Sequence, residues 1–102
     1  MIVEFEANGK PYGMILGFEA LKVLSEAQAK GSGEFQIIED VAFVSLNSYG
    51  RRKETGQITR DELMDLMDDV DTLFKIKDAV EAFSVNFSEK AGAVKPSKKG
   101  KA

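Results

Sequence analysis

The chain has 102 residues, of which 43% are hydrophobic, so it has enough material for one compact core but not for two. It contains no cysteine and no histidine. Disulfide frameworks, the common zinc sites and the nucleophile systems built on Cys or His are therefore excluded.

Charge is distributed unevenly along the chain. Residues 1–88 carry 9 basic and 16 acidic side chains, a net charge of −7, whereas residues 89–102 carry five lysines and one glutamate, a net charge of +4. Because an acidic body repels the phosphate backbone, we expect no nucleic-acid binding through residues 1–88. No apolar stretch is long enough to span a bilayer, so we expect a soluble protein with no membrane partner.

The first residues predict a short β-hairpin. Residues 2–6 alternate in character, and Asn8-Gly9 is the dipeptide that best supplies the positive φ angles of a two-residue turn. The second strand is expected from Lys10 to about Leu16. Because Pro11 lacks an amide hydrogen, this strand or its outer side should lie at an edge.

Two helices are predicted next. The first, after Gly17, has apolar residues at helical spacing and ends at the flexible link of residues 31–33; its stripe consists of Phe18, Leu21, Leu24 and Ala27. The second runs from Glu34 to about Tyr49, with Phe35 and Ile38 opening its stripe. The β-branched residues within 37–44 leave a strand as the alternative, but a single strand of this length would be unusual.

Residues 50–57 are charged and bounded by glycines, which is typical of an exposed loop. Thr59 and Glu62 then form a capping box, the clearest helix start in the sequence. Residues 68–71 are rich in aspartate, which can end that third helix and cap a fourth. The fourth helix has one stripe at steps of three and four, made by Leu73, Ile76, Val80, Phe83 and Phe87, with Phe74 and Val85 off the stripe.

After Ser88 almost nothing apolar remains to be buried, so residues 89–102 are predicted to form a flexible, disordered basic tail. The prediction is therefore a single α+β domain, mostly α, over residues 1–88: a short N-terminal hairpin followed by about four helices.

The sequence offers little catalytic or metal-binding chemistry. An acidic cluster begins at Asp65, but a calcium loop counted from there would need glycine at Val70 and glutamate at Ile76. A solvated helix junction explains the cluster better. The run 51–53 is basic and could contact phosphate, although a solvated turn is the commoner meaning. We expect no enzyme, no metal and no cofactor.

In its order of elements the chain resembles the small tail assembly chaperones of long-tailed bacteriophages. The resemblance covers about residues 2–88 and depends on the hairpin at Asn8-Gly9, residues 17–21 opening a helix, residues 48–50 ending the next, and the segment 58–63 before an acidic helix pair. It implies a protein of the host bacterial cytoplasm that binds the tape measure protein, keeps it soluble, helps recruit tail tube subunits, and is absent from the mature virion.

A chaperone of this kind needs an apolar surface that fits an amphipathic helix. We expect that surface on the two C-terminal helices, rimmed by the aspartates at 68, 69 and 71, and consisting of Met64, Met67, Phe74, Phe83 and Phe87. The alternative is a structural phage tail component or a small homo-oligomeric adaptor, which would use the hairpin edge and the apolar helices for self-association.

The family often has a longer form made by programmed frameshifting. Ser97, Lys98 and Lys99 are compatible with adenine-rich codons at which a ribosome could slip back one base. The coding sequence tests this hypothesis: codons for Lys98 and Lys99 without a slippery run would remove it.

Overall fold

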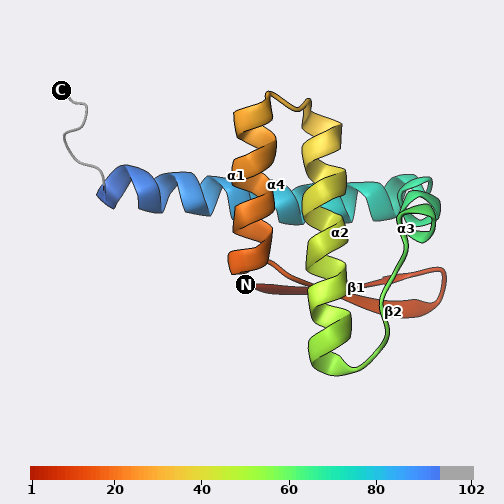
Figure 1. Cartoon of the computed structure of the whole chain (residues 1–102). Helices are drawn as coiled ribbons and strands as arrows, with labels where there is room; N and C mark the ends of the chain where they lie inside the picture. The colour runs from red at the N-terminus through yellow and green to blue at the C-terminus, as the bar shows by residue number, and fades with distance from the viewer. Residues whose placement is uncertain (95–102) are drawn as a thin grey trace.

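The computed structural model describes residues 1–94, with side chains through Lys90. Its elements are two strands, β1 (Ile2–Ala7) and β2 (Lys10–Ile15), followed by four helices, α1 (Phe18–Lys30), α2 (Glu34–Lys53), α3 (Arg60–Met67) and α4 (Val70–Val94). The α+β, mostly helical class and the N-terminal hairpin are confirmed. Figure 1 shows α1 and α2 side by side, with α4 crossing behind them and the hairpin below.

The hairpin has the predicted two-residue turn. Asn8 and Gly9 both have positive φ, 53° and 72°, and the strands pair antiparallel with Ala7 opposite Lys10 and Glu6 opposite Pro11. The Leu16 amide donates to the Met1 carbonyl over 2.8 Å, so Met1 and Leu16 form a hydrogen-bonded pair. Hydrogen-bonded and non-hydrogen-bonded pairs alternate along the hairpin, which makes Ala7 and Lys10 a hydrogen-bonded pair as well. Pro11 therefore falls in a non-hydrogen-bonded pair, and its missing N–H costs the ladder nothing.

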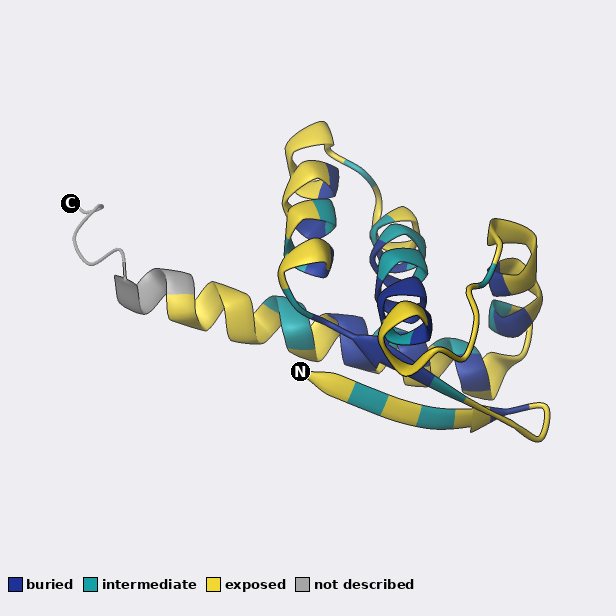
Figure 2. Cartoon of the chain, turned by 60° about the horizontal axis from the view of Figure 1, so that its bottom comes forward, coloured by how far each residue is buried: buried dark blue, intermediate teal, exposed yellow. Residues whose placement is uncertain are grey.

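The core lies where β2, α1, α2 and α4 meet, as the dark blue segments of Figure 2 show. Every element supplies at least one fully or almost fully buried apolar residue; the largest of these side chains include Met14, Leu24, Ile38, Val41, Leu63 and Ile76. The stripe predicted for the last helix is buried at Ile76 and Val80, whereas Phe83 is partly buried. This cluster fixes the positions of the surfaces discussed below.

α2 is longer than predicted. The segment 50–53 was expected in a loop but forms the last turn of α2, and the cap residue Glu54 that follows it has a left-handed φ of 57°. Three consecutive basic residues, Arg51, Arg52 and Lys53, occupy this turn, where cations complement the negative end of the helix dipole. The structure thus corrects the start of the loop from residue 50 to residue 54.

α4 is also longer than predicted. It continues to Val94, six residues past the expected end of the domain at Ser88, so the prediction of a disordered tail is wrong for residues 89–94. Glu89, Lys90 and Ala91 all have good helix propensity, and a helix that already exists extends at little cost even without apolar residues to bury. The Ser97–Lys99 segment lies outside the described residues.

The junction between α3 and α4 is capped as the aspartates suggested. α3 begins with the predicted capping box between Thr59 and Glu62, and ends at Met67. Asp69 then accepts hydrogen bonds from the amide and the hydroxyl of Thr72, at 3.0 and 2.8 Å. Val70 opens α4 and is 62% exposed.

We expect this cap to make stability depend on pH. The hydrogen bonds from Thr72 lower the pKa of Asp69 below its ordinary value of 3.8. A depressed carboxyl pKa contributes stability that is fully present above the unfolded value and is lost as pH falls through the folded value. Asp69→Ala should therefore lower the melting temperature at pH 7, and the difference from the unchanged chain should narrow once the pH falls below 3.8.

Thermal melts from pH 7 to pH 3 check this, with Asp68→Ala as the neighbouring control, because Asp68 has no comparable bond to α4. A difference for Asp69→Ala that stays constant over the whole range would show that the carboxylate is not the capping group.

Candidate binding surface

The five residues predicted to bind a partner do not form one groove. Met67 and Phe83 pack partly against the core, whereas Met64, Phe74 and Phe87 are 49%, 52% and 38% exposed. Phe74 and Phe87 are thirteen positions apart on α4, which places them on nearly opposite sides of the helix. The structure therefore separates an exposed site around Phe74 from a second one around Phe87.

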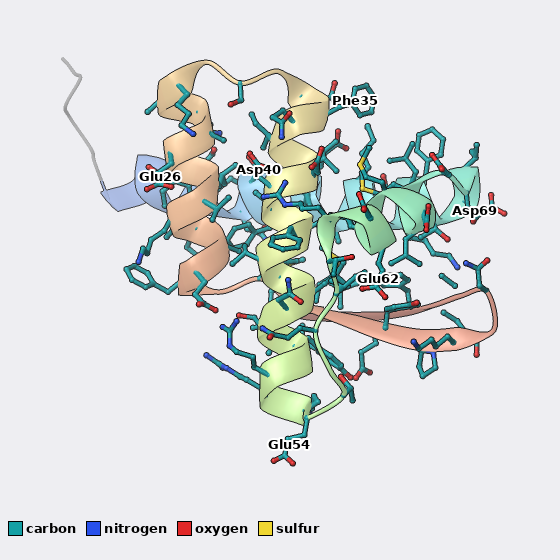
Figure 3. All side chains as sticks on the ribbon, turned by 45° about the vertical axis from the view of Figure 1, so that its right-hand side comes forward. Glu26, Phe35, Asp40, Glu54, Glu62 and Asp69 are labelled. Atoms are coloured by element: carbon teal, nitrogen blue, oxygen red, sulfur yellow. The ribbon has the colours of Figure 1, made fainter. Side chains whose placement is uncertain are left out.

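The first site, which we call the Phe74 surface, consists of three exposed apolar side chains on helices that contact one another: Phe35 on α2, Met64 on α3 and Phe74 on α4. Phe35 is 60% exposed, and in Figure 3 it projects from the first turn of α2 toward the side on which α3 lies. Isolated exposed apolar residues are ordinary, but large ones contributed by three helices are typical of an interaction site.

Ion pairs hold the three helices around the Phe74 surface in place. Arg60 of α3 contacts Glu39 and Asp40 of α2 at 2.8 and 2.9 Å, and its guanidinium lies 4.3 Å from the ring centre of Phe43. Met64 follows Arg60 by one turn, so it lies on the same face of α3. The surface is thus bordered by charges that are already paired.

The turn of α4 that follows Phe74 is linked to α2 by an ion pair. Lys77 lies one turn after Phe74 and approaches Glu34 at 3.8 Å and Glu81 at 2.7 Å. The hydrogen bond with Glu81 raises the pKa of Lys77, so this ammonium stays charged at neutral pH. Glu34 is next to Phe35 in sequence, which brings the first turn of α2 close to the Phe74 side of α4.

The second site is a shallow hollow between α1 and the exposed half of α4. Phe87 lines it together with Phe18 and Leu21. Phe18 was predicted to be on the buried stripe of the first helix but is 74% exposed, because it is the first residue of α1 and lies beyond the edge of the core. Phe35 was likewise predicted on a buried stripe and not as a binding residue, and it is exposed because it too lies in the first turn of its helix. The sequence signal in both cases is an aromatic residue in the first helical turn, shortly after a glycine.

In the basic run at the end of α2, Arg51 is paired with a carboxylate of α1, so it is not a free anion-binding site. Arg51 contacts Glu19 of α1 at 2.5 Å, and Ser48 donates a hydrogen bond to the same carboxylate. Both hydrogen bonds lower the pKa of Glu19, and the bond from Ser48 has the larger effect. The cluster therefore fastens α1 to α2.

Within residues 1–94 no helix is long and apolar enough to cross a membrane. No group of three or more His, Cys, Asp or Glu side chains in the described part of the chain is arranged to hold a metal ion. The acidic cluster that begins at Asp65 is a helix junction with Asp69 as its cap. No known protein family, curated protein or solved structure matches this chain.

Proposed function

We propose that this chain is a non-enzymatic tail assembly chaperone of a long-tailed bacteriophage. Its client is the tape measure protein, which it keeps soluble in the host bacterial cytoplasm while tail tube subunits are recruited, and it is absent from the mature virion. The identity of the client is supported by the resemblance of residues 2–88 to this family. The mode of binding is supported by the Phe74 surface.

The observation that carries the proposal is the exposure of Phe35, Met64 and Phe74, each about half or more in solvent. Leaving large apolar side chains in water is unfavourable, and covering them with the apolar face of an amphipathic helix recovers about 25 cal/mol per Å² of apolar surface. Met has a flexible side chain and Phe a large aromatic one, and both suit a surface that accepts helices of varied sequence.

The surrounding ion pairs also suit a chaperone. Arg60 and Lys77 are already paired with carboxylates on this side of the molecule, so the rim stays hydrated while the apolar centre is covered. A client held mainly through a few apolar anchors dissociates without breaking buried charge pairs, which fits a protein that leaves before the particle is finished.

We predict that Phe74→Ser weakens binding of the tape measure protein about tenfold or more, because a half-exposed aromatic side chain is removed from the surface. The free energy of unfolding should change by no more than about 1 kcal/mol, since about half of the side chain is already in solvent. Binding is measured by titrating purified client fragments, and stability is measured by urea unfolding.

The matched control is Val85→Ser, on the same helix and with a similar exposed fraction of 54%, but three turns away from Phe74. Normal binding by Phe74→Ser, or equal loss in both variants, would contradict the assignment of the client to the Phe74 surface.

A different measurement distinguishes the chaperone from the alternative, a structural tail component or a homo-oligomeric adaptor. A chaperone is absent from purified phage particles, whereas a structural subunit is present in many copies. Mass spectrometry of purified particles therefore distinguishes the two.

A further inference from the structure

A cavity distinct from both the Phe74 surface and the hollow at Phe87 lies on the other side of α3 from the Phe74 surface. It is a cavity of about 430 Å³ bounded by β2, by residues 55–58, by α2 and by α3. α3 contributes Glu62, Asp65 and Leu66 to it, whereas Arg60 and Met64 face the opposite way. Figure 3 shows Glu62 between α3 and the hairpin. The volume is within the range typical of binding pockets.

One wall of this cavity is the outer edge of β2. Because the pairs of Tyr12 with Phe5 and of Met14 with Val3 are the hydrogen-bonded ones, the N–H and C=O of Gly13 and the C=O of Pro11 point away from β1. Among residues 1–94, no backbone hydrogen bond reaches these outward groups. The outer edge of β1, by contrast, is partly covered, since the Glu6 carbonyl accepts a hydrogen bond from Lys75 over 3.2 Å.

The opposite wall is held firmly. The Asn47 side chain of α2 makes two hydrogen bonds to the backbone of Ile58, accepting from its N–H at 2.7 Å and donating to its C=O at 3.2 Å. Gly50 packs directly against the carbonyl of Gly56, where a Cβ would lie only 1.9 Å from the oxygen. The cavity is therefore preformed, which lowers the entropic cost of binding.

The floor and rim determine what fits. Leu46, Leu66 and the Tyr49 ring give an apolar floor, and Tyr49 is fixed by donating a hydrogen bond to Glu4 over 2.7 Å. At the rim, Glu62 and Asp65 outweigh the single cation Lys10. An open strand edge recognises extended backbone, an apolar floor recognises an aliphatic side chain, and an acidic rim recognises lysine or arginine.

We propose that this cavity binds an extended peptide segment of a partner protein, with an aliphatic residue flanked by basic ones, by adding it as a third strand along Pro11–Gly13 of β2. The strand bonds go to the Gly13 N–H and C=O and the Pro11 C=O. The site is separate from the Phe74 surface and does not depend on the proposed helical client, so each proposal can fail without the other.

The test uses the full chain labelled with ¹⁵N and the capped peptide acetyl-Lys-Val-Thr-Val-Lys-Val-Thr-amide. We expect titration to move the Gly13 amide proton downfield, because it gains a hydrogen bond. Two further peptides carry N-methyl groups at alternating positions in the two possible phases. Only one of the two should lose binding, since an added strand bonds to β2 through one of its edges. A peptide with glutamates in place of the lysines should bind about tenfold more weakly.

Two variants of equal charge change locate the site. Asp65→Lys, at the rim, should weaken binding about tenfold, whereas Glu26→Lys, on the distant α1, should change it less than twofold. The proposal is overturned if the peptide does not bind at millimolar concentration, if the Gly13 amide stays unperturbed, if both N-methylated peptides bind, or if the two variants behave alike.

Discussion

Gly13→Ala is expected to destabilise the protein by about 1–3 kcal/mol, as measured by urea unfolding. Gly13 lies on β2 directly beneath the ring of Tyr49, and an added Cβ would lie 2.2–2.4 Å from three ring carbons. The ring cannot easily move, because the Tyr49 hydroxyl donates to Glu4 on β1, a bond that also raises the pKa of Tyr49. The substitution should therefore separate the hairpin from α2.

Gly33→Ala is the matched control, because its Cβ would enter open space and its φ of −70° suits any residue. Its effect should be a fraction of that of Gly13→Ala. In a Tyr49→Ala background, Gly13→Ala should cost little, since the clashing ring is gone. If the cost of Gly13→Ala is the same with and without Tyr49, the contact is not its cause.

Leu63→Ala is expected to lower the free energy of unfolding by about 2–5 kcal/mol. Leu63 is completely buried, and together with Leu66 it holds the eight-residue α3 against the core. So short a helix is not stable by itself, so it depends on these two side chains. α3 forms part of both proposed binding sites, so its loss should impair both.

The neighbouring Met64→Ala separates stability from binding, because Met64 is 49% exposed whereas Leu63 is completely buried. It should change the unfolding free energy by about 0.5 kcal/mol or less and still weaken client binding. A Leu63→Ala variant as stable as Met64→Ala would contradict the position given to α3.

Local signals explain what could be predicted from the sequence. Asn8-Gly9 dictates a tight turn by its φ preferences alone, and the capping box at Thr59 satisfies backbone amides within one helical turn. The buried stripe from Ile76 to Val80 follows from helical periodicity. None of these depends on residues distant in sequence, and the structure has each of them.

Features that depend on distant contacts or on helix ends were mispredicted. Gly50 resembles a loop residue, but it lies in α2, and a glycine is needed there because the Gly56 carbonyl packs where a side chain would be. Phe18 and Phe35 have the spacing of core residues, yet the core ends before it reaches them. The cavity beside β2 brings together segments 8–13, 46–49 and 55–66, and no pattern within one segment could indicate it.

The predicted partner-binding residues show the same limit. Periodicity placed Phe74 off the buried stripe, and its exposure agrees with that placement. Periodicity alone could not show that Phe87, on the stripe, extends past the core to line a hollow with Phe18 of α1, nor that the first turn of α2 approaches α4 through Glu34 and Lys77. Which exposed residues share a surface is decided by how the helices cross.

The most direct measurement is co-expression of this chain with the large helical tail protein encoded nearest to it, followed by a pull-down from the soluble fraction. Parallel cultures express that protein alone or with a chain carrying Phe74→Ser. The chaperone proposal predicts that the partner is insoluble alone, soluble in a complex with the unchanged chain, and largely insoluble with Phe74→Ser. A partner whose solubility is the same in all three cultures would contradict it.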